Sequence, residues 1–485
     1  MELKKYKLGD IAKIEISGVD KKSVDGETPV RLCNFVDVYR NWAITQKLSE
    51  NFMIASAKET EIAKCSIHKG QVAITKDSET RDDIGIPAYI ADDFDNVLLG
   101  YHCALITPND DVLDGKYLNA FMHTRYIQKY FENNASGSGQ RYTLSNETIF
   151  QIPILLPSLE VQKAIGNLLS NIDRKIELNR QINDNLEKMA KQLYDYWFVQ
   201  FDFPNENGRP YKSSGGAMVW NEKLKREIPK EWDNCTLEYY LIIKNGRDHK
   251  HLGNGIYPVY GSGGEIRKVD SFIYSGESIL MPRKGSLNNI MYVNDAFWSV
   301  DTMFYSEMKQ PHCAKYVFYS IKDIDFTRWD SGTGVPSMTS STLYSILLVK
   351  PDADSLAKFD EIITPLFLMI KKNEMQIVEL TKQRDDLLPL LMNGQASVNY
   401  HLSKWSIGFL CLDMHIEYDK DIVQKEADKQ DFNPLVRKPY SFTFFKHTSY
   451  PFFMFLLQFK LFVTMSHKLP TDFHNKVHTN VVQRF

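Results

Sequence analysis

The sequence predicts an α+β fold in which two mixed, strand-rich domains are each followed by a long helix of the coiled-coil type. Two observations predict the helices: residues 159–203 and 356–391 both carry apolar residues at alternating three- and four-residue spacing, which places them along one side of a helix. A third observation predicts a duplication, because similar short motifs recur in the same order before both helices. We therefore expect an internal repeat.

Residues 1–158 predict the first domain, a mixed structure rich in strands. Short apolar runs separated by Asp, Asn and Gly indicate strands at 71–75, 86–91 and 104–108. A helix is expected around residues 116–131.

The helix expected over residues 159–203 is the most regular stretch of the chain. From Val161 to Tyr196 it would be roughly 54 Å long at ~1.5 Å per residue, and Lys175 and Asn179 interrupt its apolar seam. This length exceeds what one small domain needs, so we expect the rest of the chain to be organised around it.

Residues 204–227 are rich in Gly, Pro, Asn and Ser, which predicts a linker. Residues 228–354 predict a second domain of the same plan. The stretch 276–286 is similar to 70–79, and 331–351 is similar to 136–157. Two copies of a binding unit on one chain imply a partner that also offers two sites.

The second long helix is expected within residues 355–396. Its end, 384–391, holds Leu387, Leu388, Leu390 and Leu391, which is more apolar surface than one helix seam requires. We expect part of it to face another subunit. The alternative is that the surplus leucines pack on the first domain.

Residues 397–485 form an atypical tail with a different composition. From Tyr400 onward there is a single glycine, Gly408, and half of all the histidines. The apolar run at 450–463 is too short to span a bilayer and is broken by polar residues. A buried helix, a surface-seeking amphipathic segment and translated sequence outside the ancestral frame all fit this composition; we favour the last and assign the tail no function.

Bulk composition is ordinary for a soluble globular protein, with 43% hydrophobic and 25% charged residues. The six cysteines are scattered without metal-like spacing, and the N-terminus lacks the apolar core of a signal peptide. We therefore expect a cytoplasmic protein with free thiols.

Catalytic motifs are missing from the sequence. There is no phosphate-binding G-x-x-x-x-G-K-[ST] loop, no G-x-S-x-G nucleophile motif and no His or Cys cluster with metal-ligand spacing. We expect a chain that is not an enzyme and that holds no catalytic residue, metal or cofactor of its own.

The stronger signals are polar residues in glycine-containing loops at equivalent places of the two domains. Arg, Lys, Asn, Gln and Ser supply the donors and acceptors that base edges and phosphates require. Acidic residues slightly outnumber Lys and Arg in both domains, so a DNA contact would come from a patch rather than from bulk charge. The alternative is that these loops are ordinary surface turns. The candidate DNA-binding residues are Lys76, Arg81, Ser138, Gln140, Arg141 and Tyr142 in the first domain, and Arg247, Lys250, Ser262, Arg283, Lys284, Ser286, Asn288 and Arg328 in the second.

Three stretches resemble one known family, the specificity subunits of type I restriction–modification enzymes. Residues 156–204 resemble its central conserved region, and 384–398 resemble its distal conserved region. "YPVYGSGG" at 257–264 and the Ser-Gly-rich ends of both domains are similar to it as well. The resemblance covers about residues 1–398 and does not extend to the tail.

The resemblance implies a non-catalytic subunit that recognises double-stranded DNA. Each domain would be a target-recognition domain that reads one half of a bipartite site, and the two helices would pack antiparallel, about a pseudo-twofold axis, as a spacer. The subunit would dock two adenine-N6 methyltransferase subunits, which use S-adenosylmethionine. Endonuclease subunits that translocate DNA, using ATP with Mg, can join such an assembly. The absence of a [DNS]-P-P-[FYW] motif agrees with this division of roles.

Two other functions remain open at this point. The duplicated domains could form a protein–protein scaffold without DNA specificity, or the chain could be a solitary enzyme acting on DNA. Binding of DNA separates the first from a recognition subunit, and methylation or cleavage by the chain alone would support the second.

Antiparallel packing of the helices also predicts a register. Setting Asn179 against Asn373 brings apolar residues together along most of the seam, and a buried Asn pair would fix that register. Two mismatches remain, Lys175 against Ile377 and Leu168 against Arg384. We expect both long polar side chains to reach out to solvent.

Overall fold

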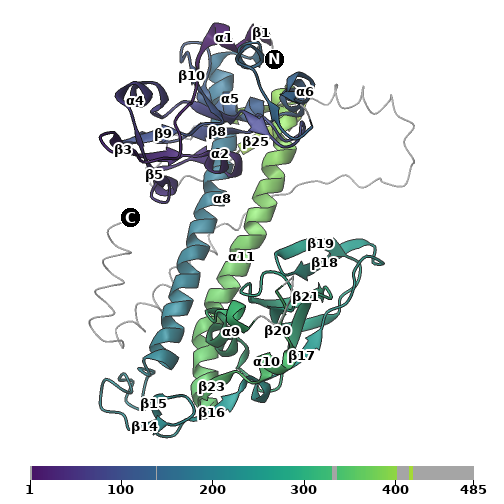
Figure 1. Cartoon of the computed structure of the whole chain (residues 1–485). Helices are drawn as coiled ribbons and strands as arrows, with labels where there is room; N and C mark the ends of the chain where they lie inside the picture. The colour runs from purple at the N-terminus through teal and green to yellow at the C-terminus, as the bar shows by residue number, and fades with distance from the viewer. Residues whose placement is uncertain (1–2, 138, 330–335, 401–413, 419–485) are drawn as a thin grey trace, which may run out of the picture. The chain divides into compact units, whose positions relative to one another are not determined.

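The computed structural model describes residues 3–137, 139–329, 336–400 and 414–418 (Figure 1). It divides into two compact units. Among the described residues, unit 1 comprises those up to 181 and those from 373 onward, and unit 2 comprises those within 182–372. Two long helices, α8 (Leu159–Tyr194) and α11 (Ala353–Met392), contribute one segment to each unit. Within the described ranges, no helix is both long and apolar enough to cross a membrane.

Unit 1 is built from a five-stranded sheet with smaller sheets beside it. The large sheet has the order β2 (Ala12–Ile16), β10 (Cys103–Pro108), β6 (Val72–Thr75), β8 (Pro87–Ile90) and β4 (Ala43–Ile44). The smaller sheets are β5 (Met53–Ala57), β3 (Thr28–Cys33) and β9 (Val97–Leu99); β11 (Ser136–Gly137), β12 (Tyr142–Thr143) and β7 (Asp77–Ser78); β1 (Lys4–Lys7) and β13 (Pro153–Leu156); and β24 (Ala396–Tyr400) and β25 (Met414–Tyr418).

Short helices cover these sheets. They are α1 (Leu8–Ile11), α2 (Phe35–Arg40), α3 (Gln46–Ser49), α4 (Glu59–Cys65), α5 (Gly115–Met122), α6 (Arg125–Asn134) and α7 (Asn146–Phe150). The single helix predicted over 116–131 is thus two helices, because the backbone of Thr124 is extended (φ −70°, ψ 149°) and interrupts the helical turn. The three predicted strands coincide with β6, β8 and β10.

One core joins the sheet of unit 1 to both long helices. All four residues of β6 are buried, as expected for a central strand covered on both faces. Ile165 and Leu169 of α8 and Leu391 of α11 belong to the same cluster, and burying each such side chain stabilises the fold by ~1.5–3 kcal/mol. Leu388, only 7% exposed, also packs there. The alternative, packing on the first domain, therefore holds for Leu388 and Leu391, and the expectation that part of this surface faces another subunit stays a prediction.

Unit 2 contains a six-stranded sheet and two separate pairs of antiparallel strands. The large sheet has the order β17 (Leu241–Asn245), β22 (Met303–Met308), β20 (Tyr274–Pro282), β21 (Met291–Ser299), β18 (Asn254–Gly261) and β19 (Gly264–Val269). The pairs are β14 (Met218–Asn221) with β15 (Arg226–Pro229), and β16 (Asp233–Thr236) with β23 (Leu347–Lys350). Its shorter helices are η1 (Asp195–Val199), η2 (Leu237–Tyr239), α9 (Ala314–Lys322), η3 (Phe326–Trp329) and α10 (Ser340–Tyr344).

Aromatic residues end the first long helix inside unit 2. After Tyr194 the chain forms one π-helical turn, and Phe201 then adopts a left-handed backbone with φ +63°. Phe198 meets Phe359 of α11 edge to face at 4.8 Å, and Phe203 stacks on Trp232 at 4.7 Å. The helix therefore stops before residue 203, and the stretch predicted as a linker (204–227) contains the ordered strand β14.

The same two hydrogen bonds occur at equivalent places in both units. In unit 1, Leu8 N donates to Ile152 O (2.9 Å) and the Tyr117 hydroxyl donates to Leu155 O (2.7 Å). In unit 2, Leu237 N donates to Ile346 O (2.8 Å) and the Tyr316 hydroxyl donates to Val349 O. These equivalent hydrogen bonds occur in the same order along the chain as the repeated sequence motifs.

The two helix segments contact each other in both units through asparagine amides. In unit 1, Asn179 Nδ2 donates to Gln376 Oε1 at 3.0 Å. In unit 2, Asn183 Nδ2 donates to the carbonyl of Ile370 at 3.2 Å. Gln376 lies three residues beyond Asn373 in the sequence, so the pairing of Asn179 with Asn373 stays a prediction.

Arg384 is buried in unit 1 instead of reaching solvent. Its side chain is 17% exposed, lies 3.5 Å from Asp173 of α8 and stands over the ring of Trp42 at 4.5 Å. Trp42 stacks in turn on His123, whose pKa is lowered to about 3 by burial and, further, by Arg384. The expectation that Arg384 avoids the core is wrong because Asp173 and Trp42 provide a partner and an aromatic face within the unit.

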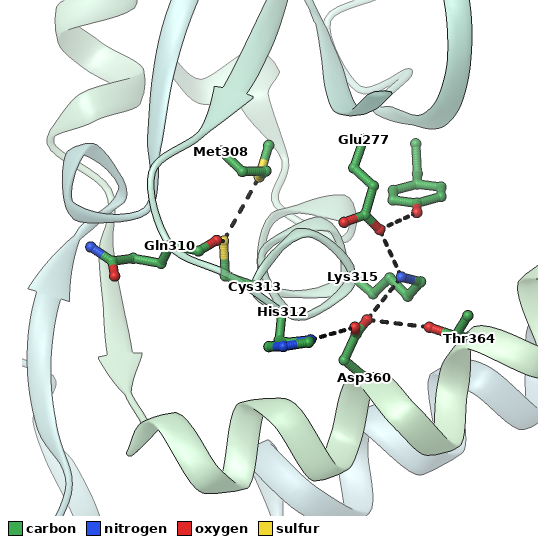
Figure 2. Close-up of polar contacts among 9 residues, drawn as sticks. Glu277, Met308, Gln310, His312, Cys313, Lys315, Asp360 and Thr364 are labelled. Atoms are coloured by element: carbon green, nitrogen blue, oxygen red, sulfur yellow. Dashed lines mark hydrogen bonds and ion pairs between the residues drawn. The ribbon is translucent and has the colours of Figure 1, made fainter. Parts of the chain in front are cut away.

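Lys315 is the corresponding buried charge of unit 2. Its side chain is 5% exposed, and Nζ lies 2.7 Å from Glu277 and 2.8 Å from Asp360 (Figure 2). His312 Nδ1 and the Thr364 hydroxyl also reach Asp360, and Tyr292 donates to Glu277. Burial raises the pKa of Asp360, but hydrogen bonds from Lys315 and His312 outweigh it, so that the pKa falls below its usual value.

The second residue of helix α5 occupies the same place in unit 1 that Lys315 occupies in α9, but it meets a different surface. Lys116 is half-buried and donates to Asn167 at 2.8 Å. A Cβ on Gly166 of α8 would lie 2.8 Å from both Lys116 Cβ and the Tyr117 nitrogen. Helix α5 therefore touches α8 through a glycine, whereas α9 touches α11 through an ion pair at Asp360, the residue at the corresponding distance from the helix start.

Replacing Lys315 with Met should destabilise unit 2 by about 3 kcal/mol, because two partly buried carboxylates lose their shared cation. Urea unfolding followed by hydrogen exchange in α9 measures the loss. The control is Lys358→Met, which breaks an exposed pair with Asp354 (2.6 Å, lysine 59% exposed) and should cost less than about 0.5 kcal/mol. Equal effects of the two substitutions would contradict a structural role for the Lys315 network.

The pH dependence of unit 1 should reveal Asp173. Burial, the largest cause, raises its pKa to about 6 against the lowering by Arg384 and Arg180. A raised folded-state pKa adds stability below the unfolded value of 3.8, and this contribution disappears as pH rises through about 6. The stability of Asp173→Asn relative to the wild type should therefore increase by about 2 kcal/mol between pH 4 and pH 7, on top of a pH-independent cost of removing the carboxylate beside Arg384. Hydrogen exchange of unit 1 amides measures this, with Asp110→Asn at an exposed position as control; a pH-independent difference would contradict it.

Candidate functional site

A junction of three segments gathers the candidate residues of unit 1. We define this first junction by residues 76–78, 100–102 and 141–144. Lys76 N donates to His102 O at 2.7 Å, and Leu144 N donates to Lys76 O at 2.9 Å. Thr143 pairs with Asp77 between strands β12 and β7. The main chain alone therefore brings together loops that are far apart in the sequence.

Three side chains meet on the first junction. His102 Nδ1 contacts Asp77 Oδ2, and Arg141 Nη2 lies 2.9 Å from His102 Nε2, 2.7 Å from His102 Nδ1 and 3.4 Å from Asp77 Oδ2. Asp77 is 17% exposed, His102 27% and Arg141 60%. Burial, the largest cause, raises the pKa of Asp77, but hydrogen bonds from Thr143 and His102 and the positive charge of Arg141 outweigh it, so the pKa falls below its usual value and the carboxylate stays ionised.

Aromatic rings border this group. The guanidinium of Arg81 stands 5.0 Å from the centre of the Tyr142 ring, a cation–π distance. The ring of Tyr101 lies 3.8 Å from that of His102. Exposed guanidinium groups beside flat aromatic surfaces are suited to anionic ligands with π faces.

The structure brings four predicted residues of unit 1 to the first junction: Lys76, Arg81, Arg141 and Tyr142. Gln140 is exposed in the adjoining loop, and Ser138 lies outside the described residues. Sequence reasoning missed Asp77 and His102. Asp77 adjoins Lys76 and could have been noticed, whereas His102 is reached only through the turn before β10 and left no signal in the sequence.

Unit 2 builds a second junction on the same main-chain hydrogen bonds. We define it by residues 283–285, 299–302 and 336–338. Arg283 N donates to Thr302 O at 2.8 Å, and Met338 N donates to Arg283 O at 2.9 Å. Lys284 forms a bridge with Ser337, and Gly285 takes a left-handed φ of +89° that favours glycine. Arg283 and Lys284 are exposed on this frame.

Asparagine side chains attach neighbouring loops to the second junction. Asn289 Nδ2 donates to Ser262 O at 2.8 Å, which anchors the turn between β18 and β19. Asn288 accepts from Phe326 N (2.8 Å) and donates to Asp325 (3.2 Å), and Asp325 also pairs with the 80% exposed Arg328. The predicted residues gathered here are Ser262, Arg283, Lys284, Ser286, Asn288 and Arg328.

Arg247 and Lys250 occupy a separate loop that touches the second junction through the backbone. Arg247 N donates to Ser299 O at 2.8 Å, and both side chains are exposed. Arg267, which the sequence did not single out, holds this loop from beneath by donating to the carbonyls of His249 (2.6 Å) and Leu252 (3.0 Å). Its donors are thus used for structure.

For the described residues, the sequence predicts no metal-like cluster and only free thiols. No group of three or more His, Cys, Asp or Glu in those ranges could hold a metal ion. Cys33, Cys65, Cys103, Cys235 and Cys313 are unpaired, and Cys411 lies outside the described residues. The two junctions present exposed cations, amides and hydroxyls, which can hydrogen-bond a polar or anionic ligand.

Comparison with known proteins places this architecture among related chains. Residues 1–188 match a family model described as the type I restriction modification DNA specificity domain. The chain is 26% identical over 378 residues to the type I restriction enzyme MjaIX specificity subunit of Methanocaldococcus jannaschii, covering 70% of this chain and 81% of that protein. It is 31% identical over 141 residues to the HindI specificity subunit of Haemophilus influenzae, covering 29% and 30%.

A solved structure has a similar fold. The crystal structure of the type-I restriction-modification system S subunit from M. genitalium matches with a TM-score of 0.52 at 17% sequence identity. The match covers 81% of this chain and 96% of that chain. At this identity the likeness concerns the fold alone.

Proposed function

We propose that the chain is a specificity subunit of a type I restriction–modification complex, the subunit that recognises the DNA sequence. Its residues 1–188 match the specificity-domain model, and 70% of the chain aligns with a specificity subunit at 26% identity. The observation that carries this proposal is the recurrence of one main-chain junction with different polar side chains. Lys76 and Arg283 make the same two backbone hydrogen bonds, while the side chains around them differ. A constant frame with variable donors is suited to reading two different sequences.

Each unit reads one half of a bipartite site in double-stranded DNA. The first junction supplies Arg81 and Arg141, and the second supplies Arg283, Lys284 and the amide-anchored loops. Arg and Lys match guanine O6 and N7, Asn and Gln match adenine, and the remaining cations contact phosphates. Because each unit carries one such junction, we assign the two target-recognition domains to residues 1–158 and 228–354.

The chain recognises DNA without doing chemistry. Two adenine-N6 methyltransferase subunits with S-adenosylmethionine, and endonuclease subunits with ATP and Mg, would supply the reactions. Within this chain, α8 and α11 would form an antiparallel coiled coil that docks the methyltransferase subunits and relates the repeats by a pseudo-twofold axis. The Asn179–Gln376 and Asn183–Ile370 hydrogen bonds support helix pairing in each unit, and pairing over the whole length would set the unread spacer between the half-sites.

Exchanging residues 228–354 for the matching domain of a relative should change one half of the methylated sequence and leave the other half intact. The reason is that each frame carries its own side chains. Methylome sequencing of a host that expresses the hybrid with its methyltransferase measures the outcome.

A change in both halves, or in neither, would contradict modular reading. Sequence-independent binding together with intact partner binding would favour the protein–protein scaffold. The unmodified chain, expressed with the same methyltransferase, is the control.

Adding one heptad after Asn179 and one before Asn373 should lengthen the spacer and leave the bases of both half-sites unchanged. Seven residues keep the seam in phase and add ~10 Å of helix, which corresponds to about three base pairs at ~3.4 Å each. The methylome again gives the measurement. A seven-residue insertion after Glu206, in an exposed turn, is the control, and an unchanged spacer in the double insertion would rule out the helices as the ruler.

A further inference from the structure

We propose that Asp77 and His102 form a clamp that positions Arg141 to read one guanine of the first half-site, with His102 and Asp77 as positioning residues. This inference rests on the proposed DNA-recognition function. It names a specificity residue of the first unit and the two groups through which its geometry is set.

The exposed fraction of the three side chains increases from Asp77 through His102 to Arg141. Asp77 and His102 are 17% and 27% exposed, whereas Arg141 is 60% exposed. The clamp therefore sits in the frame while the guanidinium faces outward. A long arginine side chain that is already ordered loses less conformational entropy when it meets a base edge.

The hydrogen-bond pattern assigns the imidazole a role. Arginine only donates, so the nitrogen of His102 that faces it must be unprotonated. Arg141 Nη2 lies 2.7 Å from Nδ1 and 2.9 Å from Nε2 of His102. With Nδ1–H directed at Asp77, Nε2 is the nitrogen that can accept. All described contacts of Arg141 use Nη2, so in the described ranges the hydrogens of Nε and Nη1 and the second hydrogen of Nη2 face a further acceptor. Nη2–H together with either Nε–H or Nη1–H forms a pair of parallel donors, which matches O6 and N7 of guanine.

The backbone conformation of His102 is also held by its surroundings. His102 has φ +70°, in the left-handed region that non-glycine residues rarely adopt. The hydrogen bond from Lys76 N to His102 O (2.7 Å) holds the turn in this conformation. Strained conformations of this kind persist where surrounding structure over-determines them, which is frequent at ligand-binding sites.

The second junction carries other side chains at the equivalent places. Lys284 bridges Ser337 as Asp77 pairs with Thr143, and Thr302 accepts from Arg283 as His102 accepts from Lys76. The clamp therefore belongs to the first unit, as expected when the two half-sites differ.

The test measures the methylome of a host expressing the full chain, wild type or variant, with its methyltransferase subunits. Arg141→Ala should relax one guanine of the first half-site, with the preference at that position falling ~10–100-fold. Asp77→Asn and His102→Ala should relax the same position, and Asp77→Asn should add nothing to Arg141→Ala. His102→Asn should restore the preference, since an amide both donates and accepts and asparagine tolerates a positive φ.

The control is Arg125→Ala, which removes an exposed pair with Glu132 (3.3 Å, arginine 72% exposed) on the same unit and should leave every position unchanged. The thermal unfolding of each variant is measured alongside its methylome. If His102→Ala does not fold, Asp77→Asn and His102→Asn still test the inference.

Three results would overturn the inference. The first is relaxation by Arg141→Ala without relaxation by Asp77→Asn. The second is an additive effect of the two substitutions, and the third is equal weakening at all positions, which indicates a phosphate contact. A wild type that methylates a bipartite site unaffected by these variants refutes the clamp alone, whereas a wild type without sequence preference refutes the proposed function.

Discussion

The main chain of Lys76 and that of Arg283 are each hydrogen-bonded on both sides, to a turn that precedes the next strand and to the segment that leads into the next long helix. Both junctions depend on this arrangement. Because backbone groups form the central hydrogen bonds of each junction, most side chains on it can vary without breaking those bonds. A fold that keeps its frame in the backbone can change what it binds without losing its stability.

Buried charge is the second constraint on the structure. Arg384 in unit 1 and Lys315 in unit 2 are both tied to a carboxylate, Asp173 and Asp360 respectively, that belongs to a long helix. Such pairs contribute little net free energy, yet removing one partner is costly. They specify which face of each helix packs inward. They therefore contribute more to the uniqueness of the packing than to the free energy of unfolding.

Sequence patterns predicted the elements better than their ends. The heptads of α8 and α11 and the strands β6, β8 and β10 follow from apolar periodicity, which burial enforces. The break at Thr124 and the π turn at Asp195–Val199 depend on tertiary contacts of aromatic rings, which periodicity does not report. Among the site residues, Arg141 and Arg283 were found by residue type and loop context. His102 could not be found in this way, since its position beside Arg141 arises from pairing of segments almost forty residues apart (|i−j| = 39).

The contrast between Gly166 and Asp360 bears on how such chains recombine. Helix α5 lies so close to α8 that any side chain at 166 would collide with it, whereas α9 needs a carboxylate at the corresponding place of α11. A crossover that moved the second domain onto the first helix would leave Lys315 with Glu277 but without the Asp360 carboxylate, beside a glycine. Each domain therefore suits the opening turns of the helix behind it. An exchange between the second domains of two relatives keeps Asp360 in place, whereas an exchange between the two domains of one chain would separate Lys315 from it.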